Sequence, residues 1–112
     1  MINISTQEIY VCSSHVNMRN SFDSLCFLVD SMFPKKLLTG SVFVFLNKAG
    51  NSMKVLYWDL DGFVIYYKRL EKGRFRIEKN GKTQISRREF FMLLEGIKPK
   101  VLNPRFSLKK IT

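Results

Sequence analysis

The sequence predicts an α+β fold, in which an antiparallel β-meander of four to five strands is flanked by an N-terminal and a C-terminal helix. Two segments carry apolar residues at three- and four-residue spacing, which is typical of amphipathic helices. Between them lie β-prone runs joined by loops of about three to five residues, which connect only antiparallel neighbours. We expect the two helices to bury their apolar stripes against one face of this sheet.

The N-terminal part begins with a short β-prone run at residues 9–12, which is followed by the first predicted helix. Asn20 or Ser21 is placed to cap this helix, and Asp23 lies in its first turn, where a negative charge is favourable. Pro34 ends the helix, because the residue before a proline is pushed out of the helical region. The apolar stripe of the helix consists of Phe22, Leu25, Cys26, Val29, Met32 and Phe33.

The predicted meander has strands at residues 41–46, 53–58, 63–70 and 74–78. The turns between these strands contain Gly, Asn and Asp, which favour tight turns. Ser86 and Glu89 then form the capping-box pattern that begins a second helix, and Gly96 is placed to end it. These assignments divide the chain into a single α+β domain at residues 1–97 and a basic C-terminal tail at residues 98–112.

The positive charge of the chain is large and lies in its second half. Lys and Arg number 19 against 9 Asp and Glu, which gives a formal net charge of +10. Residues 1–61 contain as many acidic as basic residues, so the whole surplus lies in residues 62–112. A surplus of this size favours a polyanionic partner, meaning nucleic acid, an anionic membrane or an acidic protein.

Basic residues near the end of the meander form the candidate nucleic-acid-binding site. By the two-residue period of a strand they make a stripe along one face and edge of the sheet, with Tyr67 or Trp58 interleaved. Such cations neutralise the phosphate backbone of DNA, while aromatic rings stack on exposed bases. The alternative interpretation is a solvated edge whose charges prevent aggregation. Besides the tail, the residues predicted to contact DNA are Arg69, Lys72, Arg74, Arg76, Arg87 and Arg88.

Residues suited to chemistry are few. Asp59 and Asp61 would suit Mg²⁺, but their position beside a glycine favours a turn. His15, Cys12 and Cys26 would supply three ligands for zinc, whereas a structural zinc site takes four, and cysteines on apolar stripes are usually small buried hydrophobes. We therefore predict no catalytic residue, no metal, no cofactor and no small-molecule substrate, so that the protein is not an enzyme.

The sequence also predicts where the protein resides. No apolar run approaches the roughly 18 residues of a membrane span, and the N-terminus has no pattern of a signal peptide. Two cysteines are too few for a disulfide scaffold, which suggests a reducing compartment. We expect a cytoplasmic, nucleoid-associated protein with no membrane contact.

Three blocks of the sequence strongly resemble a known family. They are Gly40-Ser-Val-Phe-Val-Phe-Leu-Asn-Lys-Ala-Gly50, Lys54-Val-Leu-Tyr-Trp-Asp-Leu-Asp-Gly-Phe63 and Tyr67-Lys-Arg-Leu-Glu-Lys-Gly-Arg-Phe75. With the flanking Asn17-Met-Arg-Asn-Ser-Phe-Asp-Ser-Leu25 and Leu93-Leu-Glu-Gly96, they resemble the TnpB-type accessory protein of the sixty-six family of bacterial insertion sequences. That small protein is encoded beside the transposase of the element.

The sequence departs from the pattern of this family at a few positions. Asn17, Asn20 and Ser21 stand where the family usually has Asp, Lys and Gly, and Leu60 replaces a usual Gly between the two aspartates. The missing Lys at position 20 weakens a DNA-binding role for this first loop.

The resemblance implies a part in transposition, but it carries over no particular biochemical activity. We expect a non-catalytic accessory protein that binds DNA, the transposase of the same element, or both, through the basic sheet face. The alternative is a protein–protein interaction module with no direct nucleic-acid contact. In that case Tyr57, Trp58 and Phe63 form the contact, and the charge only aids solubility.

Overall fold

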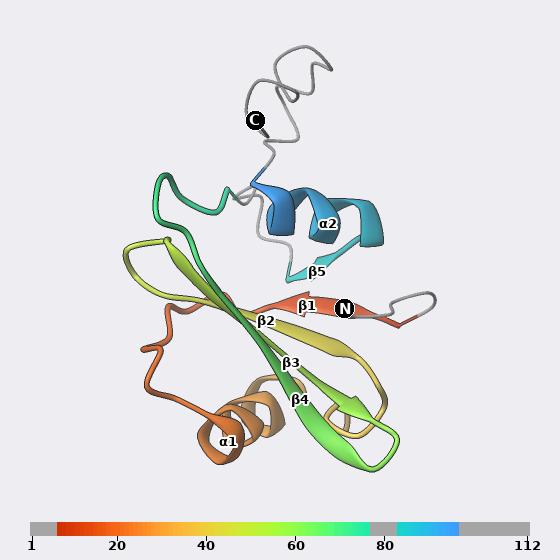
Figure 1. The fold of residues 1–112 in the computed structure, drawn as a ribbon. Coiled ribbons are helices and arrows are strands. Elements are labelled where there is room, and N and C mark those ends of the chain that lie inside the picture. The colour runs from red at the N-terminus through yellow and green to blue at the C-terminus, as the bar shows by residue number, and fades with distance from the viewer. Residues whose placement is uncertain (1–6, 77–82, 97–112) are drawn as a thin grey trace.

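The computed structural model describes residues 7–76 and 83–96, which form a five-stranded sheet and two helices (Figure 1). In chain order the elements are β1 (Ile9–Val11), α1 (Phe22–Met32), β2 (Val42–Leu46), β3 (Ser52–Asp59), β4 (Gly62–Arg69), β5 (Gln84–Ile85) and α2 (Arg87–Glu95). The predicted α+β class is confirmed. The tail predicted at residues 98–112 lies outside the described residues.

The centre of the sheet is the predicted meander. β2 pairs antiparallel with β3, with Phe43 opposite Leu56, and β3 pairs antiparallel with β4, with Lys54 opposite Tyr67. Turns of a few residues join these strands, as the Gly and Asn positions of the sequence predict. The ends of β2 and β4 therefore lie at the same end of the sheet, to the left in Figure 1.

The prediction of a purely antiparallel sheet is wrong, because β1 pairs with β2 in parallel. Ile9 lies opposite Val42 of β2 and, on its other side, opposite Ile85 of β5, which is antiparallel to β1. The strand order is β4-β3-β2-β1-β5. The chain leaves β1 and returns beside it through a long connection that contains α1. A connection of this length permits parallel pairing, which a short hairpin loop does not.

The strand predicted at residues 74–78 is also wrong over the residues that the structure describes. β4 ends at Arg69, and residues 70–76 form a loop. The side chain of Phe75 is buried in the core, and its backbone N–H donates to the carbonyl of Gly50 at 2.8 Å. The fifth strand is instead β5, which has two residues and is too short to stand out in the sequence.

Each face of the sheet is apolar and is covered by one helix. The cluster on the α2 side includes Val42, Val44, Met53, Val55, Phe90 and Leu93. The cluster on the α1 side includes Leu25, Val29, Phe43, Phe45 and Leu56. Successive residues of β2 alternate between these clusters because successive side chains of a strand point to opposite faces. The expectation that both helices share one face is therefore wrong: α1 (orange) and α2 (blue) lie on opposite sides of the sheet in Figure 1.

The ends of both helices follow the predicted capping residues. Ser21 is the N-cap of α1, and its N–H donates to Ser24 Oγ at 3.1 Å. At the start of α2, Glu89 N–H donates to Ser86 Oγ at 3.1 Å while Ser86 N–H donates to Glu89 Oε1 at 2.9 Å, which is the capping box. Gly96 ends α2 in the left-handed conformation, with φ 74°.

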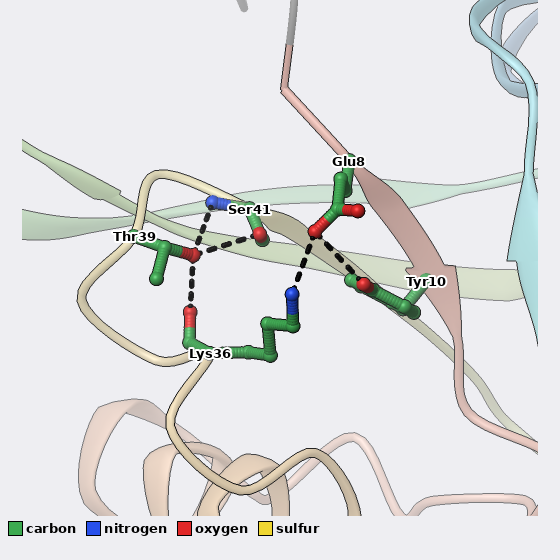
Figure 2. A network of polar contacts seen from close by, with 5 residues as sticks. All are labelled: Glu8, Tyr10, Lys36, Thr39 and Ser41. Atoms are coloured by element: carbon green, nitrogen blue, oxygen red, sulfur yellow. Dashed lines mark hydrogen bonds and ion pairs between the residues drawn. The ribbon is translucent and has the colours of Figure 1, made fainter.

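A polar network ties the start of β1 to the connection between α1 and β2 (Figure 2). Glu8 Oε1 accepts hydrogen bonds from Lys36 Nζ and from the Tyr10 hydroxyl, each at 2.9 Å. Thr39 Oγ1 donates to the carbonyl of Lys36 at 2.7 Å and lies 2.8 Å from Ser41 Oγ. The hydrogen bond from Lys36 is the main reason why the pKa of Glu8 lies below its ordinary value of 4.5.

We expect Glu8→Gln to reduce the acid sensitivity of the fold by a small amount. A carboxylate with a lowered pKa in the folded state stabilises that state at neutral pH, and this contribution is lost as the pH falls through the lowered pKa. Both partners of the ion pair are about half exposed, so the effect is modest. The measurement is the urea midpoint from neutral pH down to pH 3. The control is Glu95→Gln, and an equal pH dependence in both variants and the wild type would contradict the prediction.

Candidate nucleic-acid interface

The loop after β4 lies against the turn between β2 and β3. Phe75 anchors this loop, because its ring is buried in the α2-side cluster and its N–H bonds Gly50. The stem of Arg74 lies across Gly50, where an added Cβ would meet three of its side-chain carbons at 3.6–3.7 Å. Gly50 also has φ 77°, which favours glycine. The loop and the turn therefore form one continuous surface at the end of the sheet.

This surface carries a group of exposed cations that we call the basic patch. It consists of Lys48, Arg69, Lys72, Arg74 and Arg76. Four of these were predicted from the sequence, whereas Lys48 was not, because it lies in a turn that precedes the basic half of the chain. Lys48 could have been predicted from the meander, because in a meander the β2–β3 turn lies beside the end of β4. The one carboxylate in this loop, Glu71, accepts from Arg69 Nε at 3.0 Å.

The structure does not bring Arg87 and Arg88 to the basic patch. Both lie in the first turn of α2, whereas the other end of this helix contacts β4, where Lys68 Nζ donates to the carbonyl of Leu94 at 2.7 Å. At 1.5 Å per residue, the first turn is about 10 Å from that contact along the helix. The Arg87 guanidinium lies 5.8 Å from the ring centroid of Phe91. These two arginines therefore lie away from the end of the helix that contacts β4.

One of the two aromatic rings predicted to interleave with the basic residues lies near them. Tyr67 is 52% exposed and lies two residues before Arg69, on the same face of β4. Trp58 lies at the opposite end of β3 from Ser52, the residue that pairs with Arg69. At about 3.3 Å per residue this places Trp58 about 20 Å away along the strand. Trp58 is therefore not part of the basic surface.

A buried lysine beneath Tyr67 was not predicted from the sequence. Lys54 is 8% exposed, and its Nζ donates to the carbonyls of Met18 at 2.8 Å and Asn20 at 2.6 Å. The same ammonium group lies 4.9 Å from the ring centroid of Tyr67, a cation–π contact. The ammonium group of Lys54 is therefore bound inside the protein, and its hydrogen bonds hold the segment before α1 against the sheet. The same group contacts one face of the Tyr67 ring.

The predicted protein-contact residues are divided between the two faces of the sheet. Tyr57 packs against the α2-side cluster, whereas Phe63 packs against the α1-side cluster. Trp58 stacks edge-to-face on Phe63, with ring centroids 5.0 Å apart. Beside this pair, Leu60 at the hairpin tip is 91% exposed and has φ 58°. This left-handed conformation is unfavourable for Leu and is adopted readily by Gly.

The side chains that were considered as metal ligands or nucleophiles lie in surroundings that suit a structural role. Asp59 and Asp61 are exposed in the β3–β4 turn, where Asp61 N–H donates to the carbonyl of Asp59 at 2.5 Å. Burial raises the pKa of the Cys12 and Cys26 thiols, which disfavours their reactive thiolate forms. Within residues 7–76 and 83–96, no group of three or more His, Cys, Asp or Glu side chains is placed to hold a metal ion.

These features define a small α+β domain with a mixed sheet between two helices and a basic patch at one sheet end. The model of the family described as "IS66 Orf2 like protein" matches residues 7–104, and the chain belongs to this family. Membership associates the protein with transposition, as an accessory protein of an insertion sequence.

Two similar proteins come from Sinorhizobium fredii (strain NBRC 101917 / NGR234). The uncharacterized protein y4hO is 33% identical over 91 residues, which cover 80% of this chain and 79% of the relative. The uncharacterized protein y4jC is 32% identical over 91 residues, which cover 80% and 78%. No solved structure matches the chain. Neither described helix is long and apolar enough to pass through a membrane.

Proposed function

We propose that this protein is a non-catalytic accessory factor for the transposition of a bacterial insertion sequence and that it binds DNA through the basic patch. The observation that carries the proposal is the grouping of five exposed Lys and Arg side chains on two adjoining loops, with Glu71 as the carboxylate among them. Lys and Arg that contact successive phosphates release condensed counterions, which favours binding. The transposase of the same element is the second partner that we propose.

The position of the basic patch favours contacts to phosphates rather than to bases. Its residues lie on loops and at a strand end, whereas base reading in the major groove usually uses a helix or a β-ribbon. Phe75 and Gly50 hold the loop in place, so less conformational freedom is lost when Arg74 meets a phosphate. The ion pair with Glu71 uses Nε of Arg69 and leaves the terminal nitrogens of its guanidinium to contact DNA.

We expect the double variant Arg74→Gln/Arg76→Gln to bind all duplex sequences more weakly. Each lost phosphate contact reduces the slope of log affinity against log salt by about 0.9, so the slope should flatten by about two units. The fold should be retained, because exposed substitutions of this kind change stability by about 0.5 kcal/mol. The measurement is a fluorescence anisotropy titration of labelled duplexes over a range of salt concentrations, with a thermal melt of each variant.

The matched control compares Arg74→Gln with Lys35→Gln. Both remove one exposed positive charge, but Lys35 lies in the connection between α1 and β2, outside the basic patch. We expect the first variant to lower the salt slope by about one unit and the second to leave it unchanged. Equal slopes for the two variants would mean that the binding follows net charge and not the basic patch.

A second candidate function is a protein-interaction module that makes no contact with nucleic acid. The observation in its favour is the exposed Leu60 beside the Trp58–Phe63 pair, since exposed apolar groups at a hairpin tip suit a protein partner. An interface centred on aromatic rings is less sensitive to salt than binding through several cations. Pull-down of the transposase at high salt, lost in Trp58→Ala and kept in Arg74→Gln/Arg76→Gln, would favour this second function.

A further inference from the structure

β4 is an edge strand of the sheet in the part of the chain that the structure describes. β3 pairs with the inner side, and within the described residues no segment pairs with the outer side. β4 has eight residues, and residues 62–67 contain neither charge nor proline. Edge strands in natural proteins are usually short or are protected by charges, prolines or bulges. The uncharged stretch of β4 at residues 62–67 is therefore suited to accept another strand.

The direction of the backbone groups shows which residues of β4 face outward. Leu70 N–H donates to the carbonyl of Asn51 at 2.7 Å, so the backbone groups of Leu70 point toward β3. In an antiparallel pair this direction alternates with every residue. The N–H and C=O groups of Phe63, Ile65 and Tyr67 therefore point away from β3, toward the open side.

We propose that β4 pairs antiparallel with β4 of a second copy of this chain, about a twofold axis at Ile65. In this register Ile65 of one copy exchanges backbone hydrogen bonds with Ile65 of the other, and Phe63 does so with Tyr67. The axis is perpendicular to the sheet, so two five-stranded sheets become one continuous sheet with both α1 helices on the same side. This proposal does not depend on DNA binding.

The side chains of β4 are complementary to themselves in this register. The ring of Tyr67, which is 52% exposed, lies opposite Phe63 of the second copy and covers it. Arg69, which also pairs with Glu71 of its own chain, comes beside Asp61 in the turn just before β4, so a cation lies near a carboxylate, and the twofold axis repeats both contacts. If the register shifts by two residues so that Arg69 faces Phe63, Glu71 of the following loop comes beside Asp61 of the turn, and two like charges lie close together. The charges therefore favour the first register of the two copies over this shifted one.

The experiment measures the mass of the protein in solution by sedimentation equilibrium, without DNA and at physiological ionic strength. We expect a dimer for the wild type and an increase of the dissociation constant of about tenfold or more for Asp61→Lys and for Arg69→Glu, since each places like charges opposite one another. The double variant Asp61→Lys/Arg69→Glu restores the opposite charges and should restore the dimer. Asp30→Lys makes the same charge change on the exposed side of α1 and should leave the dimer unchanged.

A backbone test separates this interface from any other dimer contact. Tyr67→Pro removes an N–H that faces the open side, and a proline on an edge strand leaves the bonds to β3 in place. Circular dichroism and thermal melting establish that each variant is folded. A monomeric wild type, a dimer that persists in folded Tyr67→Pro, or a double variant that remains monomeric would each overturn the proposal. A wild type that stays monomeric but binds the transposase through β4 would assign the edge to that partner.

Discussion

Phe75→Ala is expected to lower the free energy of unfolding by about 3–5 kcal/mol, the range for removal of a buried phenylalanine ring. The ring is 6% exposed and lies in the α2-side cluster, so its loss leaves a cavity in the core. Phe75 also holds the loop that carries Lys72, Arg74 and Arg76. We therefore expect the variant to lose DNA affinity although no cation is removed. Urea denaturation and anisotropy titrations measure the two effects.

The control for this prediction is Phe75→Leu, which keeps most of the buried volume. Substitutions that nearly conserve volume usually cost less than 1.5 kcal/mol, and the loop should remain anchored. DNA affinity should therefore be close to that of the wild type. If Phe75→Ala unfolds at the same urea concentration as the wild type, the loop is not anchored through this ring, and the surface described for the basic patch is wrong.

Lys54→Met is expected to destabilise the protein by about 2–3 kcal/mol, because hydrogen bonds to a charged donor are strong and the variant loses two of them. The carbonyls of Met18 and Asn20 lose the ammonium group that they share, while methionine keeps the apolar stem of the side chain. NMR shifts should change most in the segment before α1 and at Tyr67, since Lys54 contacts both. Urea denaturation gives the change in stability.

Lys48→Met is the matched control for Lys54→Met. Lys48 is exposed in the β2–β3 turn, and its substitution should change stability by no more than about 0.5 kcal/mol. It should weaken DNA binding instead, because Lys48 belongs to the basic patch. We therefore expect Lys54→Met to change mainly the stability and Lys48→Met to change mainly the proposed DNA binding. A Lys54→Met variant as stable as the wild type would show that the two hydrogen bonds contribute nothing to stability.

The elements that the sequence predicts well are those with strong local patterns. The stripe from Phe22 to Phe33 has helical spacing, Pro34 ends it, and the structure forms α1 over Phe22–Met32. The capping box of Ser86 and Glu89 correctly predicts the residue at which α2 begins. The meander is predictable because its turns are short and its strands are long. In these cases local physical chemistry alone decides the structure.

The parts that the sequence does not predict depend on contacts between distant residues. A three-residue strand such as β1 has the same local pattern whether it pairs in parallel or antiparallel. Arg74-Phe75-Arg76 alternates like a strand, but a loop with a single buried anchor gives the same alternation. The burial of Lys54 follows from the position of the Met18 and Asn20 carbonyls, which no local pattern reports.

The candidate site also has a part that the sequence predicts and a part that it does not. Arg69, Lys72, Arg74 and Arg76 are close in sequence, so their grouping was predictable without the fold. The addition of Lys48 and the exclusion of Trp58 both follow from which end of the sheet each residue occupies. That information is topological, and it becomes available only when the pairing of β2, β3 and β4 is known.

The position of β1 in the sheet has a consequence for the order of folding. β2, β3 and β4 are joined by short turns, so they meet with little loss of chain entropy. Ile9 of β1 must find Val42 and Ile85, which are far from it along the chain, and such long-range closures are slow. The meander is therefore expected to form early, while β1 joins it late and brings β5 and α2 into place. Until then the α2-side face of the meander, which is rich in valine, is open to water, and a newly made chain is most prone to aggregate in this interval.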